Sequence, residues 1–266
     1  MLAPRGRLWC RFNRFGLLNP AARLSFRPVH SKIVAAPIAY EQPTLNKAWD
    51  AFVAHIPTIL VIWIVTAVIG VFGYGAQLLL TLLGNGFSGE TLGSAIDGST
   101  SVSSWGFWMG QLGQFPFSIL TSLVSVLCAA VPAMYFATGE KITIERAFRT
   151  LLERPWRYLL AGLLFAIVGA VGFLFCILPG IAVALVTPVY VNKIFTTEMS
   201  ILDAFSSSFQ AVYRSENGWT FVGIQILAGV VVIVVSICTC GLGLLFAPAM
   251  ASFYVQNAAY RQGVLT

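Results

Sequence analysis

The chain has 266 residues, of which 58% are hydrophobic and 10% are charged, and its mean hydropathy is +0.82. Soluble domains carry about 25% charged residues, so this composition excludes an ordinary soluble domain and indicates an integral membrane protein. The net charge of +6 predicts no nucleic-acid partner, because the basic excess lies in one short segment and the remainder is close to neutral.

That basic segment is the N-terminus. The first 32 residues carry six arginines, one lysine and no acidic residue. We predict a basic, disordered tail over residues 1–40. The composition is also typical of an organellar transit peptide, and a start codon assigned too early would produce it as well. A secretory signal is excluded, because no apolar core of suitable length follows the arginines.

Six apolar runs follow, each long enough, or nearly so, to cross a hydrocarbon layer of about 30 Å. They cover approximately residues 56–83, 115–136, 157–177, 180–195, 219–237 and 241–259. Each is expected to be helical, because lipid offers no hydrogen-bond partner to an open backbone. Connections at 84–114, at Leu178-Pro179-Gly180 and around Gly241 join them in pairs.

The predicted fold class is therefore all-α integral membrane, with six transmembrane helices arranged as three helical hairpins. The membrane domain is expected at 41–262, in units of about 41–137, 138–195 and 196–262.

If the six runs cross the membrane in turn, all lysine and arginine side chains fall on the same side of the membrane. They lie in the segment up to Lys47, in 141–157, in 193–214 and at Arg261. The three opposite connections contain no lysine or arginine. Because cytoplasmic loops carry the excess of these residues, both termini are predicted to be cytoplasmic, in a multi-pass protein of a bacterial inner membrane.

A motif of the form [ST]-[LI]-x-x-A-[FW] begins at Thr44, Thr143 and Ser200, just ahead of each hairpin. Serine or threonine is a good helix N-cap, and the apolar residues that follow recur at helical spacing. The sequence therefore predicts a short cytoplasmic amphipathic helix before each hairpin. These helices are expected to end at Pro57, at Pro155 and at Asn217-Gly218.

Three prolines recur in the same way as the motif, once in each hairpin. Pro132, Pro188 and Pro248 fall in the second helix of each hairpin and are predicted to kink it. With the motif, they define an internal repeat of amphipathic helix, span, turn and kinked span.

Little in the chain predicts reaction chemistry. No ionisable residue lies in the interior of any of the six runs, which argues against proton relays and acid–base catalysis in the membrane. The five cysteines and two histidines have neither disulfide nor zinc spacing, so no catalytic residue, metal or cofactor is predicted. A cytoplasmic cluster of Arg146, Arg149, Arg154 and Arg157 is a candidate contact for anionic lipid headgroups, although orientation alone would also require such a cluster.

One stretch resembles a known family. It runs from Phe175-Cys176-Ile177-Leu178-Pro179-Gly180 through Thr187-Pro188, Glu198-Met199-Ser200-Ile201 and Ala204-Phe205-Ser206-Ser207-Ser208 to Trp219. Over about residues 140–260 this pattern is similar to the bacterial membrane domain fused to some glycerophosphodiester phosphodiesterases, and to its stand-alone relatives. The resemblance implies a helical membrane fold. It implies no hydrolase activity, because the catalytic domain and its metal-binding groups have no counterpart in this sequence.

We therefore expect a non-enzymatic inner-membrane protein with a structural, accessory or lipid-interacting role. Its expected partner is the bilayer, including anionic headgroups. The alternative is a transporter or permease component for a neutral or amphipathic solute. The sequence predicts no particular substrate, protein partner or oligomeric state.

Overall fold

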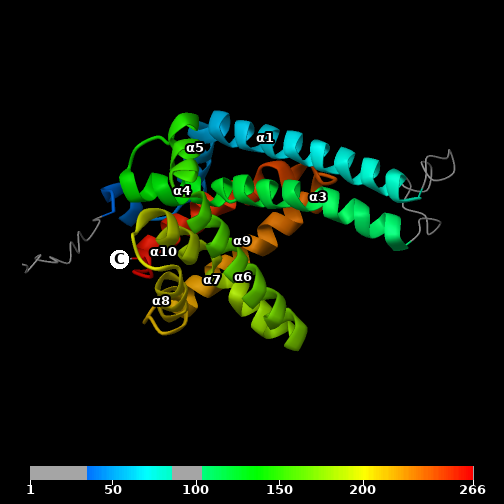
Figure 1. Ribbon diagram of the computed structural model, residues 1–266. Helices are drawn as coiled ribbons and strands as arrows, with labels where there is room; N and C mark the ends of the chain where they lie inside the picture. Colours follow the sequence, from blue (N-terminus) through cyan, green and yellow to red (C-terminus); the bar gives the residue numbers. More distant parts are fainter. Residues whose placement is uncertain (1–34, 86–103, 266) are drawn as a thin grey trace, which may run out of the picture. The chain divides into compact units, whose positions relative to one another are not determined.

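The computed structural model describes residues 35–85 and 104–265, and over these residues the chain is helical and contains no strand (Figure 1). The elements in chain order are η1 (Pro37–Tyr40), α1 (Leu45–Asn85), α3 (Ser104–Ser125), α4 (Leu127–Thr138), α5 (Ile144–Glu153), α6 (Pro155–Phe175), α7 (Ile177–Thr196), α8 (Ile201–Tyr213), α9 (Gly218–Cys238), η2 (Leu242–Leu245) and α10 (Ala247–Arg261). Most of the predicted tail at 1–40 lies outside the described residues.

The predicted all-helical fold is confirmed. Within the described chain, five stretches are long and apolar enough to cross a membrane, namely α1, α3 with α4, α6, α7 and α9. This number is compatible with a multi-pass membrane protein, and it is one fewer than the sequence predicts.

Helix α1 is one unbroken helix of 41 residues, so the prediction that a short helix ends at Pro57 is wrong. A proline inside a helix removes one backbone hydrogen bond, a loss that packed neighbours can offset. The residues around this position supply such packing, because Phe52, His55 and Ile59 are all buried.

Helix α3 begins at Ser104, inside the stretch that was predicted to be a loop. It lies antiparallel to α1 at very close range (Figure 1). A Cβ added to Gly84 would lie 2.7 Å from the Cα of Gly106, and one added to Gly110 would lie 3.0 Å from the carbonyl oxygen of Gln77. Glycines allow two helices to approach in this way. Glycines of the predicted connection at 84–114 therefore form part of a helix interface.

Helices α6 and α7 are separated by Cys176 alone, whose backbone is extended (φ −171°, ψ 150°). The turn predicted at Leu178-Pro179-Gly180 is therefore two residues too late, because these residues form the first turn of α7. Proline is tolerated there since the first N–H groups of a helix have no partner within it. Gly180 is required by the close packing of the two helices, because a Cβ would lie 2.4 Å from the ring of Phe173.

The predicted sixth span at 241–259 is divided. Gly241, with φ +91°, ends the turn after α9, and the short helix η2 precedes α10, which has 15 residues. This is less than the roughly 20 residues that a perpendicular span needs. In contrast to the predicted interior kink, Pro248 lies in the first turn of α10, where it removes no interior helical hydrogen bond.

The buried core lies where the beginnings of α1, α6 and α9 meet the ends of α4, α7 and α10. Ile59, Phe221 and Phe253, from three of these helices, are at most 2% exposed. At the other end of α6, by contrast, Leu174 and Phe175 are 84% and 81% exposed. The long helices therefore extend from a common core and present apolar side chains to their surroundings.

The two ends of the described chain pack together in this core. Ala35 and Ala39 are buried in the same cluster as Val264 and Leu265. The Nδ2 of Asn257 in α10 donates a hydrogen bond to the carbonyl oxygen of Ala39 at 2.9 Å. The described chain therefore begins and ends on the same side of the core.

Candidate functional site

Three helices begin where the repeated motif predicts them. They begin at the end of the core where the lysines and arginines of the described chain lie, which we call the charged end. The hydroxyl of the first motif residue accepts the backbone N–H three positions later, at 3.3 Å for Thr44, 3.3 Å for Thr143 and 3.1 Å for Ser200. The alanines of the motif, Ala48, Ala147 and Ala204, are at most 3% exposed. The predicted helix starts are confirmed, and in each the same motif position faces the core.

Two of the predicted arginines lie on α5 and are paired with nearby carboxylates. Arg146 Nη1 is 2.6 Å from Glu140 Oε2, and Arg149 Nη2 is 3.0 Å from Glu145 Oε1. Glu140, Glu145 and Arg149 are largely exposed, and Arg146 is partly buried. Exposed pairs of this kind are weak and exchange easily, so both guanidinium groups remain accessible to an external anion.

The other two arginines, at the start of α6, contact the connection between α7 and α8 instead. Arg154 pairs with the carboxylate of Glu198, and Arg157 Nη2 donates to the carbonyl oxygen of Thr197 at 2.7 Å. The hydrogen bond from Arg154 holds the pKa of Glu198 below its ordinary value, because it favours the charged carboxylate. The four predicted arginines therefore form two separate pairs at one end of the molecule, with different protein partners.

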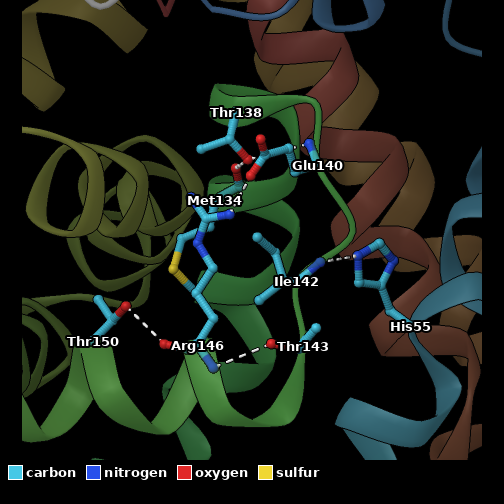
Figure 2. A network of polar contacts seen from close by, with 8 residues as sticks. All are labelled: His55, Met134, Thr138, Glu140, Ile142, Thr143, Arg146 and Thr150. Atoms are coloured by element: carbon cyan, nitrogen blue, oxygen red, sulfur yellow. Dashed lines mark hydrogen bonds and ion pairs between the residues drawn. The ribbon is translucent and has the colours of Figure 1, made fainter.

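A hydrogen-bonded clamp joins α1 to the connection between α4 and α5. His55 Nε2 accepts the backbone N–H of Ile142 at 3.1 Å, and Thr58 Oγ1 donates to the carbonyl oxygen of Ile142 at 2.9 Å. His55 Nδ1 is 2.7 Å from the carbonyl oxygen of Ala51, so this nitrogen carries the ring proton and donates it. Figure 2 shows the His55 ring directed at the backbone of Ile142. Both polar backbone groups of this fully buried residue are thus satisfied by α1.

The connection that α1 holds is itself ordered by local contacts (Figure 2). Gly139 ends α4 with φ +73° and donates its N–H to the carbonyl oxygen of Tyr135 at 2.7 Å. A Cβ on Gly139 would meet the Cβ of Ala36 at 2.7 Å. The left-handed backbone and the close approach both require glycine here.

A second polar network is buried between α7 and α10. Asn192 Nδ2 donates to the Tyr260 hydroxyl at 3.1 Å and to Gln256 Oε1 at 3.2 Å. Gln256 Nε2 donates to the carbonyl oxygen of Pro188 at 2.8 Å. Because each polar group finds a partner, the network fixes the position of α10 against α7.

Two of the three predicted proline positions lie in the interior of helices, Pro132 in α4 and Pro188 in α7. Pro188 has no N–H for the carbonyl oxygen of Ala184, and the hydroxyl of Thr187 donates to that oxygen at 2.6 Å. The helix therefore continues through the proline with the freed carbonyl satisfied.

Sequence reasoning missed the residues of both networks. Asn192 and Gln256 lie at the ends of apolar segments, next to Lys193 and Asn257, and an amide in such a segment is a signal that could have found them. His55 stands one residue before the first apolar run, so its burial was not visible from the pattern. No group of three or more potential metal ligands occurs among the described residues.

Comparisons with models of protein families, with curated proteins and with solved structures found no match. The resemblance to the membrane domain associated with phosphodiesterases therefore stays a prediction.

Proposed function

We propose that this chain is a non-enzymatic multi-pass protein of the inner membrane, with an accessory, lipid-interacting role and both termini in the cytoplasm. The observation that carries the proposal is the distribution of charge over the described helices. From Ala51 to Asn85, from Ser104 to Gly139 and from Asn217 to Tyr260 there is no lysine, arginine, aspartate or glutamate. The exposed surface of these segments is largely apolar, and lipid is the solvent suited to it.

An even number of crossings is supported by the packing of the chain's described ends. Arg261 Nη1 donates to the carbonyl oxygen of Tyr40 at 3.3 Å, and Asn257 binds the carbonyl oxygen of Ala39. Two ends in contact lie on the same side of a bilayer, whereas five crossings would separate them. We therefore propose that η2 and α10 together return the chain across the membrane as a sixth crossing.

The repeated unit is supported by α5 and α8. Each begins at a capping hydroxyl and buries its motif alanine. α5 ends at Glu153 and α8 at Tyr213, each shortly before the next long helix. α1 begins in the same way and departs from the pattern by continuing through Pro57. We propose three related units, of which the first has its short helix fused to its span.

A structural use of the buried polar groups supports a role without catalysis. His55, Thr58, Asn192, Gln256 and Asn257 are all buried, and each bonds to the backbone or to a side chain of another segment. These residues join helices to one another.

The lipid-interacting role is proposed for the arginines of α5 and α6. Between Glu140 and Arg157 the chain has five basic and three acidic side chains, so this segment is net positive next to apolar α6. A basic residue near the surface of an anionic membrane contributes about 1 kcal/mol of attraction.

The test is native mass spectrometry of the full chain with phosphatidylglycerol and phosphatidylcholine. The Arg→Gln variant at positions 146, 149, 154 and 157 is expected to lose the preference for phosphatidylglycerol. An Arg→Lys variant at the same four positions keeps the charge and is the control, which is expected to retain the preference. An unchanged preference in the glutamine variant would contradict the proposal.

A further inference from the structure

A pocket of about 270 Å³ opens at the charged end of the core, between the first turns of α1, the end of α4, α10 and η1. Aromatic side chains from α4 and α10 line it, namely Tyr135, Phe136, Phe253 and Tyr254. The Tyr135 and Phe253 rings lie edge to face with centroids 6.1 Å apart. Three of the α1 residues that line the pocket are alanines, Ala48, Ala51 and Ala54, and their small side chains leave the space open.

The mouth of this pocket carries an excess of negative charge. Glu41, Lys47 and Asp50 line it. Lys47 Nζ is already paired with Glu41 Oε2 at 2.6 Å. Among the described residues, no cation lies within ion-pairing distance of Asp50. The three side chains leave a net charge of −1, which favours a cationic ligand.

We propose that this aromatic pocket binds the ammonium group of a small organic cation. Asp50 supplies the countercharge, and the faces of Tyr135 and Tyr254 supply the attraction that aromatic rings exert on a desolvated ammonium. The volume is below the roughly 300–1,000 Å³ of sites for drug-sized ligands, so it suits a methylated ammonium group. The cation can come from a soluble amine or from the headgroup of an amine-bearing lipid.

This proposal does not rest on the lipid-interacting role of the arginines. The pocket contains none of Arg146, Arg149, Arg154 and Arg157, and its residues come from other elements. A negative result for one proposal therefore does not contradict the other.

The test uses the full chain in an uncharged maltoside detergent, titrated with choline and, separately, with its neutral isostere 3,3-dimethyl-1-butanol. Isothermal titration calorimetry measures both affinities. Choline is expected to bind saturably, and the isostere at least about ten-fold more weakly, because only choline carries the charge that Asp50 and the rings attract. Equal affinities for the two ligands, or no binding of choline at millimolar concentration, would overturn the proposal.

Two pairs of variants locate the site. Asp50→Asn is expected to weaken choline binding about five-fold, whereas Glu216→Gln removes a carboxylate from the exposed α8–α9 connection and is expected to change nothing. Tyr254→Leu is expected to weaken binding, and Tyr254→Phe, which keeps the ring face, is expected to retain it. Unchanged affinity in both Asp50→Asn and Tyr254→Leu, with unaltered melting temperatures, would overturn the assignment.

A final arm separates the two sources of the cation. Phosphatidylcholine or phosphatidylglycerol is added to the same micelles before the choline titration. If the pocket takes a lipid headgroup, phosphatidylcholine is expected to compete with choline and phosphatidylglycerol is not. If it takes a soluble amine, choline affinity is expected to be the same with either lipid.

Discussion

His55 accepts the backbone N–H of Ile142 at 3.1 Å, across 87 positions of sequence. With the bond from Thr58 to the carbonyl oxygen of the same residue, it fixes the α4–α5 connection onto α1. The ring also packs against two aromatic neighbours, with centroids 4.9 Å from Tyr135 and 5.3 Å from Phe253. The position of the α4–α5 connection therefore depends on His55, which precedes the first predicted apolar run by one residue.

The first prediction concerns this clamp. His55→Ala leaves the buried N–H of Ile142 without a partner and is expected to lower the free energy of unfolding by about 1–3 kcal/mol. Thr58→Val removes the second bond and is expected to cost about 1 kcal/mol. Thr58→Ser keeps the hydroxyl and is the conservative control. Thr66→Val is the second control, because Thr66 bonds only to Ile62 on its own helix. Equilibrium unfolding in mixed micelles measures all four, and equal stability of Thr58→Val and Thr66→Val would contradict the clamp.

The second prediction contrasts two buried amides. Asn192→Leu leaves the Tyr260 hydroxyl and Gln256 without a shared partner, so it is expected to destabilise the protein by more than about 1 kcal/mol. Gln225 is also buried, and its Nε2 has no hydrogen-bond partner within the described part of the chain. Gln225→Leu is therefore expected to leave stability unchanged or to raise it. The readout is the melting temperature beside the abundance of inserted protein. An abundant, stable Gln225→Leu protein that fails to complement a deletion would favour the transporter alternative.

The third prediction concerns the α1–α3 interface. A side chain at Gly110 meets Thr81 Oγ1 and the carbonyl oxygen of Gln77, at 2.1 and 3.0 Å from the added Cβ. Gly110→Val is expected to separate the two helices and to lower the melting temperature. Gly162 in α6 has no atom within 4 Å of an added Cβ, so Gly162→Val is the matched control and is expected to be nearly neutral. Similar melting temperatures for the two variants would show that close contact between α1 and α3 is not needed for stability.

The fourth prediction is a pH dependence. Arg154 lowers the pKa of Glu198 in the folded protein. A lowered pKa stabilises the folded state above the ordinary value of 4.5, and this contribution is lost as the pH falls through the folded value. Glu198→Gln is therefore expected to have a slightly lower melting temperature than the wild type at pH 7, and the difference is expected to shrink as the pH falls and Glu198 becomes protonated in the folded protein. Because the side chains are exposed, the effect is expected to be small. A difference that does not change with pH as the carboxylate becomes protonated would assign the loss to packing instead of charge.

The helical secondary structure and the first residues of the motif helices could be predicted, because both depend on residues that are close together in the sequence. The hydroxyls of Thr143 and Ser200 cap the residues that follow them, and the apolar spacing after them sets the buried face. The long helices follow from composition alone, since a chain this apolar must satisfy its backbone internally.

The errors arose where tertiary contacts decide the local structure. Pro57 and the glycines before residue 115 are breakers in isolation, yet packing keeps α1 continuous and makes the glycines an interface with α3. The clamp at Ile142 and the network at Asn192 join segments that are far apart in sequence, so spacing alone could not reveal them. The contacts of Arg154 with Glu198 and of Arg157 with Thr197 were hidden for the same reason. The pair of Arg149 and Glu145, by contrast, is four positions apart on one helix, a spacing that could have predicted it.

The central claim is a multi-pass orientation in which α8 lies in the cytoplasm and the turn between α9 and η2 lies outside, and one measurement tests it directly. Two single-cysteine proteins are labelled in intact cells with an impermeant thiol reagent. One keeps only native Cys240, which is exposed in the turn between α9 and η2, and the other carries only Ser206→Cys on exposed α8. Cys240 is expected to react from outside, and the cysteine at 206 only after permeabilisation. Labelling of both from the same side, or the reverse pattern, would contradict the account.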